Sequence, residues 1–62
     1  MMNNDLTYIN QMLRKFGIYV YDKIEANKLA IMRLEIQELY RNELITKSEY
    51  IRAISIIKNR GV

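Results

Sequence analysis

Basic and aromatic side chains are the groups in this 62-residue chain that could act on a ligand. Tyr19 and Tyr21 are two residues apart in an apolar segment, and Arg14 and Lys15 lie shortly before them. Alternate side chains of an extended segment point the same way, so the two rings could form one platform. Proteins that bind single strands combine such rings with cations, and each stacked base contributes about 1–3 kcal/mol.

A second basic group lies near the end of the chain. Residues 44–62 hold four basic side chains and one acidic one, whereas residues 22–43 hold four basic and five acidic ones. A basic helix face beside exposed rings is typical of proteins that bind single-stranded nucleic acid. The predicted binding residues are Arg14, Lys15, Tyr19, Tyr21, Lys47, Arg52 and Lys58. The alternative is that the tyrosines cover the core and the cations only favour the dipoles of their helices.

Few side chains in the chain could serve as catalytic groups, because it contains no Cys and no His. Thiol nucleophiles, His bases, disulfides and the usual zinc ligand sets are therefore excluded. Glu35 and Glu38 are three residues apart, which on a helix is typical of a solvated face paired with Lys and Arg. We expect a protein that binds without catalysis and needs neither a cofactor nor a metal.

An apolar group outside the expected core suggests a different function. Ile24, Ile31 and Leu34 lie on the side of their helix opposite its main apolar stripe. Soluble monomers seldom expose a contiguous apolar patch. Either the apolar segment 18–21 folds over these residues, or a partner protein or a second copy of the chain covers them. The alternative function is therefore a protein-protein interaction or homodimerisation module.

Two helices and a connector are predicted for the first two thirds of the chain. Apolar residues at i, i+3 and i+4 spacing predict a helix over residues 5–16, which Gly17 can end. Asp22 and Glu25 form a D-x-x-E capping pattern that predicts a second helix from residue 22 to residue 41 or 42. Between them, the β-branched and aromatic residues 18–21 predict a short extended connector. The expected core positions of these helices are Leu6, Ile9, Met12, Leu13, Phe16, Leu29, Met32, Ile36, Leu39 and Tyr40.

The clearest local signal begins at Thr46, which with Glu49 forms an S/T-x-x-E capping box. Ile45 and Tyr50 have the spacing of a hydrophobic staple around it. We expect a third helix that continues to residue 58 or 59. Its predicted core residues are Tyr50, Ala53, Ile54 and Ile57.

Together these elements predict an all-α fold: one domain over residues 1–62, formed by a small three-helix bundle with a short extended connector between its first and second helices. So short a chain buries only about 60% of the surface that it exposes when unfolded, so its stability is limited. No apolar run is longer than that of residues 18–21, which is far too short to cross a membrane. The N-terminal residues also lack the pattern of a signal peptide, so we expect a cytoplasmic protein.

Three segments of the chain carry a family resemblance: Met-Leu-Arg-Lys-Phe-Gly-Ile-Tyr-Val-Tyr-Asp at 12–22, Glu-Ile-Gln-Glu-Leu-Tyr at 35–40 and Leu-Ile-Thr-Lys-Ser-Glu-Tyr at 44–50. With them the chain resembles, over nearly its whole length, the YqgQ-like family of small proteins from Gram-positive bacteria. Members commonly have a Gly before the Asp that follows the aromatic segment, whereas here Tyr21 directly precedes Asp22. The resemblance implies a cytoplasmic three-helix fold with no established activity, and single-stranded nucleic-acid binding as its suggested function.

Overall fold

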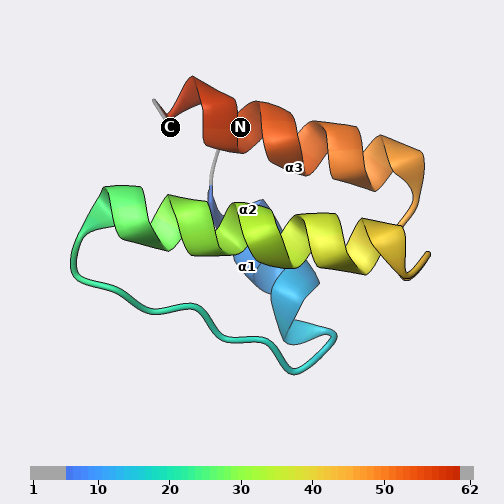
Figure 1. The fold of residues 1–62 in the computed structure, drawn as a ribbon, viewed down its shortest axis with the longest axis horizontal. Helices are drawn as coiled ribbons and strands as arrows, with labels where there is room; N and C mark the ends of the chain where they lie inside the picture. Colours follow the sequence, from blue (N-terminus) through green and yellow to red (C-terminus); the bar gives the residue numbers. More distant parts are fainter. Residues whose placement is uncertain (1–5, 61–62) are drawn as a thin grey trace.

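A computed structural model describes residues 6–60 of the chain. Within that range the backbone forms three helices, Leu6–Arg14 (α1), Glu25–Arg41 (α2) and Lys47–Asn59 (α3), and no strand. Figure 1 shows α2 and α3 side by side and antiparallel, with α1 crossing behind α2. Each pair of helices is in contact, which confirms the predicted three-helix bundle. The predicted start of the first helix, residue 5, lies outside the described residues.

The core consists of one cluster of apolar side chains from all three helices and the turn before α3. Most predicted positions are buried, but Phe16 and Tyr40 remain 38% and 37% exposed, and Ile56 is buried although it was not predicted to be. Leu6, Tyr50 and Ile54 are half-buried and pack against the cluster. The buried residues are Ile9, Met12, Leu13, Leu29, Met32, Ile36, Leu39, Ile45, Ala53, Ile56 and Ile57.

The start of α3 is fixed by the predicted capping box. The Thr46 hydroxyl accepts a hydrogen bond from the Glu49 N–H at 3.1 Å, and the Glu49 carboxylate accepts one from the Thr46 N–H at 2.8 Å. Tyr50, one residue later, stacks on Tyr40 with the ring centroids 4.3 Å apart. This stack joins the last turn of α2 to the first turn of α3.

The start of α2 differs from the prediction. The helix begins at Glu25, three residues later than expected, and Ile24 occupies the N-cap position without a side-chain cap. The Asp22 carboxylate instead accepts a hydrogen bond from the Ile24 N–H at 2.9 Å. A carboxylate bonded to the backbone two residues ahead forms an Asx turn, which holds residues 22–24 outside the helix. The predicted D-x-x-E capping box at this point is therefore wrong.

Gly17 forms the turn that sets the direction of the chain after α1. The helix ends at Arg14, and the Ile18 N–H donates to the Leu13 carbonyl at 3.0 Å across a turn in which Gly17 has φ +76°. This is a Schellman-type ending, which needs a residue in the left-handed conformation. The connector, residues 18–22, then runs in Figure 1 below α2, while α3 lies above it. None of the helices within residues 6–60 combines the length and the apolar character that a bilayer crossing requires.

Candidate nucleic-acid interface

The connector presents two tyrosine rings to solvent. Ile18 and Val20 are half-buried and pack against the core, whereas Tyr19 and Tyr21 are 75% and 85% exposed. This alternation follows from the extended backbone, in which successive side chains point to opposite sides. The interpretation in which the two tyrosines cover the core is therefore wrong. Inward packing of Ile18 and Val20 holds the segment and turns both rings outward.

Cations lie at both ends of this segment. Arg14 and Lys15, at the end of α1, are exposed, and so is Lys23, which follows the connector. Lys23 is not among the predicted binding residues, although its position two residues after Tyr21 was a usable signal. Asp22, the acidic neighbour, is held in the turn before α2. We call the exposed group Arg14, Lys15, Tyr19, Tyr21 and Lys23 the connector platform.

The cations of α3 occupy a different part of the molecule. In Figure 1, α3 and the connector lie on opposite sides of α2. Lys47 and Lys58 are exposed near the two ends of α3, about 16 Å apart along the axis at 1.5 Å per residue. The Arg52 guanidinium lies 4.3 Å from the centre of the Tyr8 ring, so this cation has a partner within the bundle. The seven predicted binding residues therefore fall into two groups, one on the connector and the end of α1 and one on α3.

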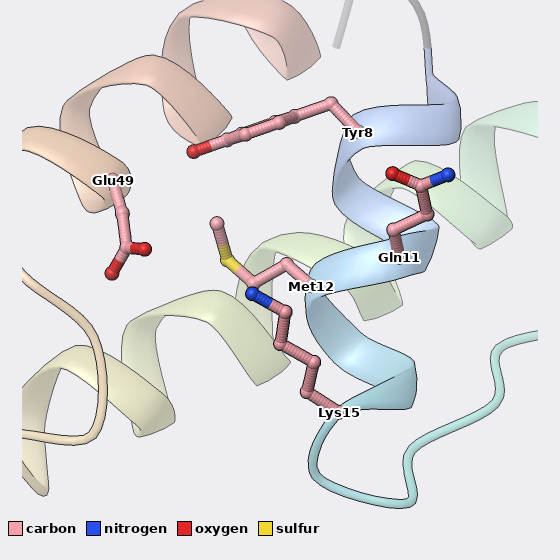
Figure 2. Close-up of a pocket in the computed structure, with 5 residues that line it drawn as sticks. All are labelled: Tyr8, Gln11, Met12, Lys15 and Glu49. Atoms are coloured by element: carbon pink, nitrogen blue, oxygen red, sulfur yellow. The ribbon is translucent and has the colours of Figure 1, made fainter.

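A small groove between α1 and α3 connects these two regions. Its lining side chains are Tyr8, Gln11, Met12, Lys15 and Glu49, and its volume is about 100 Å³. Figure 2 shows the Tyr8 ring above Met12, with the Lys15 amine and the Glu49 carboxylate below the ring. Lys15 belongs to both the groove and the connector platform, so the two adjoin. No local sequence pattern predicts this groove, because its residues come from helices that are distant in the chain.

Burial raises the pKa of the Tyr8 hydroxyl above its ordinary value. The positive charge of Arg52 lowers this pKa, but its effect is smaller than that of burial, and the negative charge of Glu49 adds to the rise. Tyr8 therefore keeps its proton at neutral pH. It presents the groove with an uncharged ring and a hydroxyl that can donate a hydrogen bond.

Comparison with known proteins gives one match. The family model YqgQ-like matches residues 4–61 of the 62-residue chain. The chain belongs to the YqgQ-like family. No curated protein and no solved structure matches it.

The apolar group of this YqgQ-like chain lies open on α2 and the turn before it. Ile24, Ile31 and Leu34 are 59%, 38% and 65% exposed. The connector therefore does not bury them, and that alternative is wrong. A shallow hollow of about 350 Å³ lies on the same helix, lined by Ala30, Arg33, Leu34 and Gln37.

The two carboxylates predicted to form a solvated face on α2 differ: Glu38 is exposed and paired, whereas Glu35 is half-buried. Glu38 accepts hydrogen bonds from Arg41 and, at 3.2 Å, from Asn42. The bond from Arg41, followed by that from Asn42, lowers the pKa of the Glu38 carboxyl. Among residues 6–60 there is no group of three His, Cys, Asp or Glu side chains placed to hold a metal ion.

Proposed function

We propose that this protein binds single-stranded nucleic acid on its connector platform and does so without catalysis. The observation that carries the proposal is the outward orientation of Tyr19 and Tyr21, which are 75% and 85% exposed on a segment anchored from behind. Both rings lie on one short segment and are open to solvent, so one ligand can contact both.

Spacing favours stacking on both rings. Tyr19 and Tyr21 are two residues apart, and an extended chain rises about 3.3 Å per residue, so the rings lie about 6.6 Å apart along the backbone. Such a distance suits two neighbouring bases of an unpaired strand. Because Ile18 and Val20 already pack against the core, the platform is ordered before the strand binds. Preorganisation of this kind reduces the entropy lost on binding.

Charge favours a backbone contact beside the rings. Residues 14–23 hold three exposed cations, Arg14, Lys15 and Lys23, and one carboxylate, Asp22. Three phosphate contacts predict that the logarithm of affinity falls with the logarithm of salt concentration with a slope of about −2. A cytoplasmic location belongs to this proposal, because cellular nucleic acids are found there and a chain without Cys needs no oxidising compartment.

The test is fluorescence anisotropy of a labelled single-stranded oligonucleotide, read at several salt concentrations. Replacing both Tyr19 and Tyr21 by Ala should lower affinity at least tenfold, since two stacked bases are lost. The matched variant with Phe at both positions keeps the rings and should bind like the wild type.

Charge is tested separately by Lys23→Ala, which should weaken binding. It should also reduce the slope of log affinity against log salt concentration by about 0.7. Arg33→Ala, which removes an exposed cation from the middle of α2, is its control. Arg52→Ala is a poor control, because Arg52 packs on Tyr8. Equal affinity of the wild type and the double Ala variant would contradict the platform.

A second function, protein-protein interaction or homodimerisation, is favoured by the exposure of Ile24, Ile31 and Leu34. This face lies on α2 and at its N-cap, directly after Lys23 of the connector platform. A partner protein or a second copy of the chain would cover it. Sedimentation of the Ile31→Glu variant tests it, as argued below.

A further inference from the structure

The groove between α1 and α3 has the size of a subsite for one ring. Its volume is about 100 Å³, whereas pockets for whole drug-sized ligands measure about 300–1,000 Å³. Figure 2 shows it as a space bounded above by the Tyr8 ring and at the side by Met12. A ring against an apolar thioether favours a flat aromatic ligand.

Tyr8 is held in place for such a contact. Its side chain is half-buried against the core cluster, and the Arg52 guanidinium lies 4.3 Å from the ring centre. The ring is therefore packed by the bundle and need not be ordered by a ligand. A cation over one part of an aromatic ring also fixes its orientation.

Glu49 supplies the polar recognition group. One oxygen of its carboxylate, Oε1, accepts the Thr46 N–H at 2.8 Å, so the capping box orients the whole group. Each carboxylate oxygen has two acceptor sites, so Oε2 and the second site of Oε1 can accept further hydrogen bonds at the groove. Among the bases, guanine presents two neighbouring donors, its ring N–H and its amino group, and these can meet one carboxylate side by side.

We infer that this groove binds a guanine base, stacked on Tyr8 and hydrogen-bonded to Glu49. The inference rests on the proposed function in one respect: Lys15 lines the groove and also belongs to the connector platform, so the guanine would be part of the same strand. The strand would pass from the exposed tyrosines over Lys15 to the groove. The protein would then prefer strands with a guanine beside the bases that stack on the connector.

Two short oligonucleotides test the preference: an all-thymine strand and the same strand with one guanine. The wild type should bind the guanine-containing strand at least fivefold more tightly, as expected for a two-bond contact to a base. Glu49→Gln should abolish this ratio, because the amide cannot accept both guanine donors. The ratio compares two strands within each variant, so the lost negative charge affects both strands alike. Glutamine also serves in the capping box, so the helix start is retained. Glu43→Gln, which removes the same charge from the exposed turn before α3, should keep the ratio.

A second measurement separates the groove from the platform. Guanosine 5′-monophosphate, titrated into the wild type, should shift the backbone amide resonances of Tyr8, Met12 and Glu49, and uridine 5′-monophosphate should not. Shifts from guanosine monophosphate without binding of the thymine strand would support the groove and overturn the platform. Binding of the thymine strand with no guanine preference and no such shifts would overturn the groove and leave the platform standing.

Discussion

Thr46 and Glu49 exchange two hydrogen bonds at the start of α3, and neither bond depends on the rest of the bundle. Thr46→Ala removes the hydroxyl that accepts the Glu49 N–H. It should lower the free energy of unfolding by about 1 kcal/mol, the usual effect of losing an N-cap. Chemical denaturation measures this change, and Thr46→Ser, which keeps the hydroxyl, should stay close to the wild type. An unchanged midpoint in the Ala variant would mean that the capping box contributes no stability.

The raised pKa of Tyr8 predicts a specific response to alkali. A group whose pKa is higher in the folded state stabilises the fold below its unfolded pKa, and this contribution is lost as the pH rises through the folded pKa. Burial is the main cause of the rise at Tyr8. We therefore expect destabilisation above about pH 10, the ordinary tyrosine pKa, to be weaker in Tyr8→Phe. Denaturation midpoints of the wild type and of Tyr8→Phe across this pH range measure the difference. Parallel curves for the two proteins would mean that the pKa of Tyr8 is not raised by folding.

At the scale of elements, Gly17 sets the path of the connector. Its φ of +76° is the left-handed conformation, and no atom lies within 4 Å of the place where a Cβ would be. A substitution therefore meets a backbone penalty and no steric clash. Gly17→Ala should destabilise the fold by about 1 kcal/mol, and Gly17→Asn by less, because Asn tolerates this conformation better. Chemical denaturation of the two variants measures these changes. An equal loss of stability in both variants would mean that the φ angle at Gly17 is not the cause.

Local chemistry determined which helix boundaries were predictable. The start of α3 was predicted correctly because Thr46 and Glu49 act within four residues. The start of α2 was not, because Asp22 has two ways to bond the backbone and the Asx turn to Ile24 excludes the predicted cap.

Contacts between helices account for the core positions that were missed. Ile56 is buried because α3 contacts α1 as well as α2, so its buried arc is wider than one apolar stripe. Arg52, one turn earlier on the same side, packs on Tyr8 of α1. An apolar stripe that predicts contact with one neighbouring helix does not include the face that contacts a second helix.

The candidate site was only partly predictable for similar reasons. Residues 18–21 are all apolar or aromatic, so composition does not say which pair faces the core. That choice depends on the register set by the turn at Gly17, which sends Ile18 and Val20 inward. The placement of α3 and the connector on opposite sides of α2 depends on helix packing and is not contained in any local pattern.

At the scale of the whole molecule, the exposed apolar group raises the question of self-association. Ile31 is 38% exposed, so a charge there meets solvent and Ile31→Glu should keep a melting temperature close to that of the wild type. Ile36→Glu, at a fully buried position on the same helix, should unfold the protein.

Analytical ultracentrifugation then tests the interaction function. If the face pairs with a second copy, the wild type sediments as a dimer and Ile31→Glu as a folded monomer. A wild-type monomer at all concentrations would exclude homodimerisation and leave only a different partner protein for this face.

The positions of the tyrosines provide separate spectroscopic signals for folding and for strand binding. The chain has five tyrosines and no tryptophan. Tyr40 and Tyr50 are stacked with an interplanar angle of 13°, so this fixed pair should dominate the near-ultraviolet circular dichroism of the folded protein. Tyr19 and Tyr21 are exposed on the connector and should contribute little to the circular dichroism. They should contribute much of the tyrosine fluorescence, and a base stacked on them would quench it. Folding and strand binding can therefore be followed independently in one unlabelled sample.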